Sequence, residues 1–540
     1  MLLKHILLTQ LDSSLTSNID PMASIQQQRR GNTSYIDGGF GTEKGSDSMF
    51  ITLEDGYYTG LEGPDKVALI CDHQSWGYLE NLVGLVPQAG CLTLTYRQMM
   101  RAARDLALVW QDCGIKRGGT LLAFLPVSAD WALSFWVAII LDLTFVPLNP
   151  MILNIDRWRG HSYPLDLLDP TVVLVPTLRE AITFDELYPE LNIIVKIVCH
   201  EQKGFLHNDW TSLEPPATAL ARARLIGGQK DLPPRPPRPP YPSDNEDRKA
   251  VLLFSQNSPD HPFKGCPLKA SNIRTTMVMK NPCSSSHKSF LVTCPSSSSA
   301  TLDAAMLAWY SGGTLVFPSA LFDAPKTLSS VELHNCTNLV CTPSNLEELI
   351  KDPSRSVRKL DSLESLVVHG GVVSANLLYR GKEALQSGWA TSSLTMAEGL
   401  GVFGWFSSCT RPYVGLSGYS DSIGTVLEGS LAKICHVDNR DNIVSRGQEG
   451  LLHIGGETVI GKYIGDVEGE RFYQDSEGKR WFITNYLATM DPEGLVRLTS
   501  EFKVCSDILP NAPSIETRDS LTFWLQQTYK PEAAGADVSP

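Results

Sequence analysis

The sequence lacks a run of apolar residues long enough to cross a lipid bilayer. Its most apolar stretch, Trp131 to Val146, is interrupted by Asp142 and is shorter than the roughly 20 residues that a spanning helix needs. The N-terminal segment MLLKHILLTQ lacks the extended apolar region and the small-residue cleavage site of a secretory signal. We therefore expect neither a transmembrane segment nor a signal peptide.

An excess of positive charge is also missing. The 540 residues include 46 Lys and Arg against 59 Asp and Glu, which gives a formal net charge of −13. Proteins that bind nucleic acids or anionic membranes generally present basic surfaces. The charge therefore argues against both of these functions.

Several short motifs of catalytic and metal sites are absent. No two of the 12 cysteines have C-x-x-C spacing, which argues against a zinc site or a thioredoxin-like redox site. The chain also lacks the G-x-S-x-G motif of serine hydrolases and the H-E-x-x-H motif of zinc peptidases. Scattered single cysteines are typical of a reducing compartment, so we expect a cytoplasmic location.

What the sequence does contain is an alternation of strand-like and helix-like patterns from Val67 to Ile226. Residues 93–115 begin as a short strand and continue as an amphipathic helix with one apolar face, formed by Met99, Ala103, Leu106 and Val109. The next predicted elements are a buried strand (120–126), an apolar helix (130–141) and another strand (144–150). This alternation favours parallel βαβ units.

Residues 231–248 form a low-complexity, proline-rich segment. Prolines lack the amide hydrogen that helices and sheets use, so we predict an exposed loop. Two interpretations remain open, a surface insertion and a ligand for an SH3-type domain.

The α/β alternation resumes from Val251 to about Gly401, and a different pattern follows from Ile423 to Leu498. There the predicted strands are shorter and separated by glycine turns: GLLHIGG (450–456), ETVIGKYIG (457–465), RWFITNY (480–486) and GLVRLT (494–499). We expect a β-rich subdomain that packs on the α/β part.

One phosphate-binding motif is nearly matched. GETVIGKY (456–463) has the glycine and lysine spacing of a P-loop, but Tyr463 stands where the motif has Ser or Thr. A P-loop holds phosphate at the N-terminus of a helix, and no helix pattern follows here. We therefore do not expect this segment to bind nucleotide.

Several longer segments occur in the order found in one protein family. They are LTYRQM (94–99), residues 118–150, residues 294–350, LESLVVHGG (363–371), LTMAEG (394–399), residues 423–434, residues 448–463 and residues 479–498. In these segments, which span about Pro64 to Glu516, the chain resembles the adenylate-forming superfamily of acyl-CoA synthetases, luciferases and peptide-synthetase adenylation domains.

The resemblance implies an α/β fold with a large two-lobed N-terminal domain, a β-rich subdomain and a truncated C-terminal cap. We expect residues 1–48 to be a loose N-terminal leader and residues 49–422 to be the α/β AMP-binding-like core. The β-rich subdomain is then residues 423–502, and residues 503–540 are the remnant of the cap.

The first signature of that family is a loop rich in Ser, Thr and Gly that ends in Pro-Lys-Gly and grips the ATP phosphates. Here the loop reads SQNSPDHPFKG (255–265) and keeps only Lys264 and Gly265. The resemblance implies a catalytic and nucleotide-binding role for Lys264 and a nucleotide-binding role for Gly265. The open alternative is an ordinary surface turn. The pair Gly370 and Gly371 resembles the nucleotide-binding glycine pair of the family.

The second signature is aromatic-Gly-x-Thr-Glu, and residues 394–398 read Leu-Thr-Met-Ala-Glu. The resemblance implies that Leu394, Thr395 and Met396 contact the nucleotide, although leucine offers no π face to the base. It also implies that Glu398 is catalytic and holds Mg²⁺, which suits a hard ion that prefers oxygen ligands. The open alternative for Glu398 is a surface carboxylate.

The third signature, Thr-Gly-Asp, places a carboxylate on the ribose hydroxyls, and here it reads Thr484-Asn485-Tyr486. The resemblance puts Tyr486 at the nucleotide, where a phenol makes one hydrogen bond instead of a bidentate pair. The hinge signature is kept only at Lys503.

In the family a small C-terminal domain follows the hinge and carries a catalytic lysine. Here 37 residues follow Lys503, and the sequence around Lys530 does not match that signature. A chain this short seldom folds alone. We therefore expect the isolated protein to form no acyl-CoA and to form adenylate only slowly, with a partner chain supplying the cap.

Two functions follow from the resemblance. The first is an ATP-dependent acyl-adenylate-forming ligase of the acyl-CoA ligase type, which activates a carboxylic acid with ATP and Mg²⁺ in a secondary-metabolite pathway. Coenzyme A and an acyl carrier are the open choices of thioester acceptor. The second is a catalytically inactive adenylation-like fold that serves as a scaffold or fragment. The altered signatures predict that ATP binding is absent or weaker than in other family members.

Overall fold

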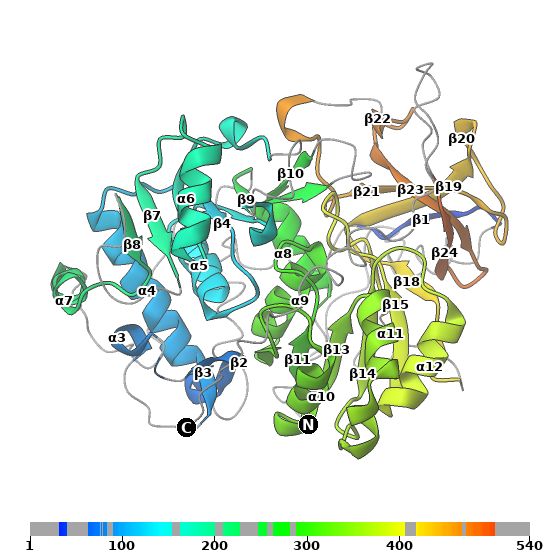
Figure 1. Ribbon diagram of the computed structural model, residues 1–540. Helices are drawn as coiled ribbons and strands as arrows, with labels where there is room; N and C mark the ends of the chain where they lie inside the picture. The colour runs from blue at the N-terminus through cyan, green and yellow to red at the C-terminus, as the bar shows by residue number, and fades with distance from the viewer. Residues whose placement is uncertain are drawn as a thin grey trace, which may run out of the picture.

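The structure is a computed structural model, and it describes residues 32–39, 63–75, 77, 79–83, 90–153, 163–199, 209–226, 247–255, 263–280, 288–405, 417–466 and 471–502. These residues form three β-sheets with helices packed around them, and the molecule has two α/β lobes beside an antiparallel sheet (Figure 1). The α/β, two-lobed architecture that the sequence predicts is confirmed.

The first lobe is built on a mostly parallel sheet in the order β10-β9-β5-β4-β6-β7-β8. Only the pair β10 and β9 is antiparallel among the described pairings. Strands such as β4 are buried along their whole length because helices cover both faces of the sheet. The bounds are β4 (Thr120–Ala123), β5 (Thr144–Pro147), β6 (Pro170–Val175), β7 (Val195–Val198), β8 (Trp210–Ser212), β9 (Lys249–Ser255) and β10 (Lys264–Lys269).

The second lobe is built on a sheet in the order β17-β15-β14-β13-β11-β12-β2-β3. Its described pairings are parallel except for β2 with β3, and β3 forms one edge. The bounds are β2 (Val67–Ser75), β3 (Cys91–Thr95), β11 (Ser289–Val292), β12 (Thr314–Phe317), β13 (Asn338–Cys341), β14 (Ser365–His369), β15 (Trp389–Ser393) and β17 (Tyr419–Ser420).

The third sheet is antiparallel, in the order β1-β19-β21-β23-β24-β18-β16, with β20 beside β19 and β22 beside β23. It corresponds to the β-rich region that the sequence predicts. The bounds are β1 (Tyr35–Asp37), β16 (Phe403–Gly404), β18 (Ser422–Val426), β19 (Ser430–His436), β20 (Asn439–Ile443), β21 (Gly450–Gly456), β22 (Phe472–Gln474), β23 (Arg480–Met490) and β24 (Val496–Glu501).

The helices of the described residues follow the strands in βαβ fashion. The α-helices are α3 (Glu80–Val83), α4 (Tyr96–Asp112), α5 (Ala129–Ile140), α6 (Leu178–Leu187), α7 (Ala217–Ile226), α8 (Ala270–Met279), α9 (Ser299–Tyr310), α10 (Ala324–Leu333), α11 (Pro343–Lys351) and α12 (Ala375–Leu385). Short 3₁₀ turns are η2 (Gly63–Asp65), η3 (Pro150–Leu153), η4 (Leu165–Leu168), η5 (Pro353–Val357) and η6 (Ile464–Asp466).

Local sequence explains where the predicted helices begin. Helix α4 starts after Thr95, whose hydroxyl accepts a hydrogen bond from Gln98 N while the Gln98 side chain accepts one from Thr95 N. This capping box satisfies two of the orphan amides at the helix start. Of the predicted face, Met99, Ala103 and Leu106 are fully buried and Val109 is partly buried against the core, which confirms the helical periodicity.

Helix α5 joins the two lobes. It is mostly apolar and is buried on all sides, as expected for a helix with no exposed face. The ring of Trp131 lies 5.7 Å from that of Phe145 on β5 and 6.1 Å from that of Phe317 on β12, so one side chain contacts strands of both parallel sheets. The two α/β lobes therefore share a continuous core.

Part of the predicted N-terminal leader is ordered in the fold. Residues 35–37 form β1, which pairs with β19 and buries Ile36 completely. Lys479 Nζ donates to Tyr35 Oη over 2.7 Å and to Asp37 Oδ2 over 3.2 Å. For residues 32–39, the prediction of a loose leader is wrong, because one buried apolar residue and two side-chain hydrogen bonds fix this short strand to the sheet.

A second correction concerns residues 457–465, which the sequence analysis assigned to a strand. Apart from a single bridge at Val459, this segment is a turn that leads into η6. Its backbone bonds a loop of the second lobe instead of a neighbouring strand, since Ile460 N donates to Glu398 O over 2.9 Å. Tertiary contacts therefore override the strand-like pattern.

Some predicted segments lie outside the described residues. These are residues 1–31 and 40–48 of the leader, residues 231–246 of the proline-rich segment and the cap remnant at 503–540. The division of the chain at residues 48, 422 and 502 stays a prediction. No helix among the described residues combines the length and the apolar character that a membrane span requires. The cysteines of the described part are free thiols.

Candidate functional site

The loop that follows β15, residues 394–401, is held tightly against the β-rich part of the chain. Gly399 forms a backbone bridge with Val459, and Ile460 N donates to Glu398 O over 2.9 Å. A Cβ on Gly399 would lie 3.2 Å from the Val459 side chain, so glycine permits this close approach. The loop therefore connects the second lobe to the segment between β21 and β22.

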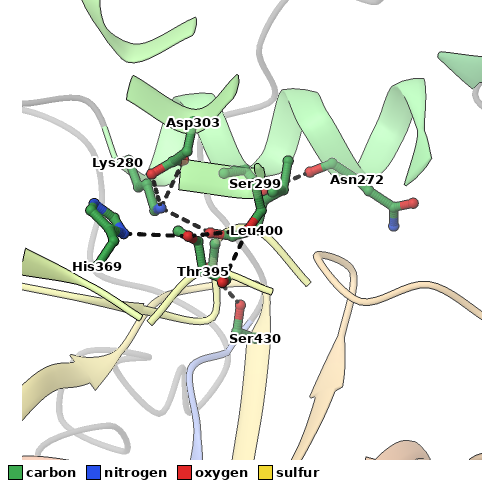
Figure 2. Close-up of polar contacts among 10 residues, drawn as sticks. Asn272, Lys280, Ser299, Asp303, His369, Thr395, Leu400 and Ser430 are labelled. Atoms are coloured by element: carbon green, nitrogen blue, oxygen red, sulfur yellow. Dashed lines mark hydrogen bonds and ion pairs between the residues drawn. The ribbon is translucent and has the colours of Figure 1, made fainter. Parts of the chain in front are cut away.

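A buried ion pair anchors the C-terminal end of this loop (Figure 2). Lys280 Nζ donates to both carboxylate oxygens of Asp303 over 2.8 Å and to Leu400 O over 2.9 Å. Lys280 and Asp303 are 6% and 5% exposed. Each of the three ammonium donors thus has an acceptor, which offsets the cost of burying the charges.

A second set of hydrogen bonds anchors the N-terminal end of the loop (Figure 2). Ser299 Oγ, at the start of α9, donates to Thr395 O over 3.0 Å, and Thr395 Oγ1 lies 3.3 Å from His369 Nδ1. Burial, and secondarily the charge of Lys280, lowers the pKa of His369 to about 3. The imidazole is therefore neutral at physiological pH and contributes as a hydrogen-bonding group.

A hydrogen bond from the phenol of Tyr463 orients the carboxylate of Glu398. Tyr463 Oη donates to Glu398 Oε1 over 2.8 Å, and Glu398 and Tyr463 are 5% and 2% exposed. Burial, and then the charge of Glu398, raises the pKa of Tyr463 well above its usual range, so this phenol keeps its proton. Lys264 Nζ lies 5.5 Å from the centroid of the Tyr463 ring. Glu398 is therefore a buried, oriented carboxylate close to a lysine.

Ser299, Thr395 and Glu398 line a polar cleft of about 370 Å³ where the three sheets meet. Its walls come from the end of β9, the N-terminus of α9, the loop after β15, and β23 and β24 of the antiparallel sheet. The lining residues are Leu253, Phe254, Ser255, Ser297, Ser298, Ser299, Thr395, Met396, Ala397, Glu398, Arg471, Phe482, Asn485, Tyr486 and Glu501. Crevices beyond the carboxyl ends of sheet strands are the usual ligand sites of α/β folds.

The cleft carries charges of both signs. Of the described residues that line it, Arg471 supplies the positive charge, and Glu398 and Glu501 supply two carboxylates. The N-terminus of α9 adds a partial positive charge and backbone amides, an arrangement that favours anions. One side of the cleft therefore suits a phosphate or carboxylate ligand.

Tyr486 and Glu501 line the cleft from β23 and β24. They are register partners in the antiparallel pair of β23 and β24. Burial, followed by the charges of Glu501 and Glu398, raises the pKa of Tyr486 above its usual range. Tyr486 therefore presents a protonated phenol next to a carboxylate.

The structure brings four of the predicted site residues to this cleft, namely Thr395, Met396, Glu398 and Tyr486. Lys264 and Gly265 lie close by at the start of β10, where Lys264 is paired with the cleft residue Ser255. A Cβ on Gly265 would lie 2.4 Å from Ile464 Cγ1, so the absence of a side chain there is explained by packing against η6.

The cleft lining does not include the other predicted residues that the structure describes. Leu394 is 4% exposed and belongs to the hydrophobic core, and the cleft lining does not include it. Gly370 and Gly371 follow β14 with φ values of +118° and +48°, which favour glycine. A Cβ on Gly371 would lie 2.9 Å from Glu501 Oε1, so the backbone of this glycine approaches the Glu501 side of the cleft. Residues 256–262 of the first signature and Lys503 of the hinge lie outside the described residues.

Comparison with known proteins decides the family. The sequence profile of the AMP-binding enzyme family matches residues 61–464, which is most of the chain and includes both lobes. The chain belongs to the AMP-binding enzyme family. This confirms the resemblance to adenylate-forming enzymes that the sequence analysis identified.

Relatives of this AMP-binding chain include acyl-CoA ligases. An acyl-CoA ligase of Pestalotiopsis microspora is 26% identical over 475 residues, which cover 84% of this chain and 78% of the relative. Among solved structures, a long-chain-fatty-acid-CoA ligase from Archaeoglobus fulgidus has a TM-score of 0.65 at 15% identity, with 87% of each chain covered. ATP-bound MatB from Rhodopseudomonas palustris has a TM-score of 0.62 at 16% identity, with 85% of this chain and 79% of that chain covered.

Sequence reasoning did not find several residues of this AMP-binding chain that line the cleft or support its wall. The sequence did single out Tyr463, because it is the residue at which the P-loop match fails. The hydrogen bond from Tyr463 to Glu398 now explains why a tyrosine stands there. Glu501 lies within the altered hinge segment, and the serines at 297–299 lie within a segment that matched the family. Arg471 has no motif around it, and only the folded arrangement places it in the cleft.

Proposed function

We propose that this chain is an ATP-dependent ligase that converts a carboxylic acid into an acyl-adenylate. The observation that carries the proposal is Glu398, a buried and oriented carboxylate in the wall of a cleft that also holds Arg471 and the N-terminus of α9. A site for a metal-bound phosphate needs a carboxylate to hold the metal ion and anion-binding groups to hold the phosphate. Membership of the AMP-binding family supports the choice of nucleotide.

Each side of the cleft has a role in this proposal. We assign the phosphates to Arg471, to Lys264 and to the backbone amides at the start of α9. We assign the adenine to the backbone of Gly370 and Gly371 and to Thr395 and Met396, and the ribose to the side of the cleft that holds Tyr486. A protein of similar fold, MatB, has been solved with ATP bound, which supports the choice of ATP as the nucleotide.

The residues present also fit Mg²⁺. Tyr463 engages Oε1 of Glu398, and the described residues place no other hydrogen bond on this carboxylate. Magnesium in nucleotide sites is usually held by one or two carboxylates together with substrate phosphates. We therefore assign Mg²⁺ to Glu398, where the ion, when bound, would offset charge on the phosphates.

The chain's own groups would act on the first reaction as follows. A carboxylate oxygen of the substrate attacks the α-phosphorus of ATP, the bond from that phosphorus to the bridging oxygen breaks, and pyrophosphate leaves. Arg471, Lys264 and the α9 amides offset the negative charge that gathers on the phosphates. A thiol then attacks the acyl carbonyl and releases AMP. Coenzyme A and the thiol of an acyl-carrier partner are the two acceptors that we propose, and relatedness to acyl-CoA ligases favours coenzyme A.

One observation favours the second candidate, a non-catalytic adenylation-like protein. The ribose side of the cleft has the phenol of Tyr486 and, beside it, the carboxylate of Glu501. Two carboxylates in one cleft repel the polyphosphate of ATP, and a phenol offers a single hydrogen bond to a diol. Both features weaken ATP binding, so a scaffold role stays the alternative.

Acid-dependent exchange of labelled pyrophosphate into ATP tests the proposal. The full chain is assayed with fatty, aromatic and amino acids, and the Glu398→Ala variant is the control. Exchange that needs one class of acid and is lost in the variant supports the ligase. Calorimetric binding of ATP with no exchange supports the scaffold. If the chain neither binds ATP nor catalyses exchange, the proposed function is wrong.

The cellular setting remains a proposal of the same kind. Free thiols at all described cysteines support a reducing, cytoplasmic location. The assignment to a secondary-metabolite pathway stays a prediction.

A further inference from the structure

Away from the cleft, three side chains of different chemistry meet where β2, β3 and α10 come together. Asp72 lies on β2, Cys91 is the first residue of β3, and His334 is the residue that ends α10. One ligand atom from each side chain lies within 4.8 Å of those from the other two. These residues are distant in the sequence, so the fold alone brings a carboxylate, a thiol and an imidazole to one point.

We propose that Asp72, Cys91 and His334 bind a Zn²⁺ ion or a similar divalent transition metal. Thiolate sulfur, imidazole nitrogen and carboxylate oxygen are the three kinds of ligand that zinc takes from proteins. The charges also match, because one carboxylate and one thiolate offset the two positive charges of the ion. The proton of the thiol and the proton between His334 Nε2 and Asp72 Oδ1 both leave when the metal binds.

The spacing requires small movements. Zinc–nitrogen and zinc–sulfur bonds of about 2.0 and 2.3 Å place tetrahedral ligand atoms roughly 3.3 to 3.6 Å apart. His334 Nε2 and Asp72 Oδ1 are 2.6 Å apart, so they would separate by roughly 0.7 Å. The sulfur lies within 4.8 Å of both atoms, so it would move inwards by at most roughly 1.3 Å. Side-chain rotation accounts for displacements of this size.

The surroundings support a metal site. Ser330 Oγ donates to Asp72 Oδ2, which orients the carboxylate so that Oδ1 faces His334. Such outer contacts to ligating carboxylates are typical of metal sites. The three ligands are partly exposed and line a cavity of about 530 Å³, through which an ion and a water ligand can enter. His73 lines the same cavity and is a candidate for the fourth position.

The site is independent of the proposed ligase activity. No described residue that lines this cavity also lines the cleft. Strand β3 is an edge of the second lobe's sheet, and the metal would fasten that edge to α10. The expected consequence is a metal-dependent gain in the stability of the second lobe.

A cobalt titration of the metal-free full chain tests the site, because Co²⁺ bound to a thiolate gives a charge-transfer absorption band. We expect the wild-type chain to show the band with one equivalent of Co²⁺ and the Cys91→Ser variant to lack it. In calorimetry, His334→Gln should weaken Zn²⁺ binding by at least about tenfold. The matched controls Cys113→Ser and His436→Gln change exposed residues of the same types and should behave as the wild type.

Two results would overturn the proposal. The first is a wild-type chain without the band, and the second is a band that persists in Cys91→Ser. X-ray absorption of the wild-type Zn²⁺ complex gives a check that does not depend on how the variants fold. One sulfur together with nitrogen and oxygen neighbours supports the site, whereas a shell without sulfur or with several sulfurs contradicts it.

Discussion

Tyr463 donates its phenol hydrogen to Glu398 across 2.8 Å and thereby connects the β-rich part of the chain to the loop of the second lobe that borders the cleft. Both residues are almost completely buried, so the bond forms where water cannot replace it. The same Tyr463 is the residue that breaks the P-loop pattern in the sequence. A tyrosine at this position is thus explained by the hydrogen bond with which it orients the Glu398 carboxylate.

The first prediction concerns this bond. Tyr463→Phe removes the donor and leaves a buried carboxylate oxygen without it. Hydrogen bonds to charged groups contribute about 1.5–3 kcal/mol, so the free energy of unfolding should fall by about that amount. Urea unfolding measures the change. Tyr379→Phe, at a tyrosine that is 49% exposed, should alter stability little, and an equal loss in both variants would contradict this explanation.

The second prediction separates a metal ligand from a structural carboxylate at Glu398. Glu398→Gln keeps the shape of the side chain but removes the charge that Mg²⁺ prefers. If the wild-type chain binds ATP, the substitution should weaken that binding about tenfold or more with Mg²⁺ present and little without it. Isothermal calorimetry with and without Mg²⁺ is the measurement, and Glu383→Gln at an exposed position is the matched control. A loss that is equal with and without Mg²⁺ rules out the metal role.

The third prediction concerns the ion pair of Lys280 and Asp303. Lys280→Met leaves the buried carboxyl of Asp303 without its cation, so unfolding should become easier by about 3–5 kcal/mol. The double variant Lys280→Met and Asp303→Leu removes both charges and should recover much of the loss. Lys326→Met, at the exposed pair with Asp323, should cost less than about 1 kcal/mol. Denaturant midpoints of the four proteins decide the matter, and no recovery in the double variant would contradict the argument.

The fourth prediction concerns acid stability. Burial lowers the pKa of His369 from 6.5 to about 3, so between these pH values the unfolded chain binds a proton that the folded chain does not. Stability linked to His369 is therefore complete above about pH 6.5 and is lost as the pH falls towards 3. The maximum slope is about 1.4 kcal/mol per pH unit. His369→Gln should reduce the slope of unfolding free energy against pH in this window, whereas His436→Gln at an exposed site should not. An unchanged slope in His369→Gln would show that this imidazole titrates normally.

Much of the fold was predictable from the sequence because its signals are local. The alternation of apolar runs and amphipathic helices identified β3 with α4 and β4 with α5, and the strands at 450–456 and 480–486 were found by their glycine boundaries. The errors arose where distant contacts decide the structure. Residues 35–37 form a strand only because β19 lies beside them, and residues 457–465 lose strand pairing because their backbone bonds the Glu398 loop.

The candidate site was predictable to the extent that a family signature covers it. Glu398 and Tyr486 were chosen by position in altered signatures, and both line the cleft. The residues that only tertiary structure brings in, such as Arg471, carry no local pattern. A motif also does not show which of its side chains are buried. Leu394 was therefore expected at the nucleotide, although it is packed in the core. The Asp72–Cys91–His334 cluster was missed because its members share no sequence spacing.

The last prediction concerns Tyr486 and Glu501, which lie beside each other on the side of the cleft that we assign to the ribose. A single Tyr486→Asp substitution supplies an acceptor that can take two hydrogen bonds from a diol. The new carboxylate would, however, face Glu501, its register partner, and lie near Glu398. After burial, the charges of these two glutamates are what raises the pKa of Tyr486 in the wild-type chain. Like charges at this distance oppose each other, so the single variant should improve ATP affinity little. Tyr486→Asp combined with Glu501→Gln removes the repulsion and should improve affinity by about tenfold or more.

Calorimetry at fixed ionic strength compares the wild-type chain, both single variants and the double variant. The argument requires the two substitutions to be coupled. If Tyr486→Asp alone binds ATP as tightly as the double variant, Glu501 does not act on this side of the cleft, and the weak ATP binding that we expect must have another cause.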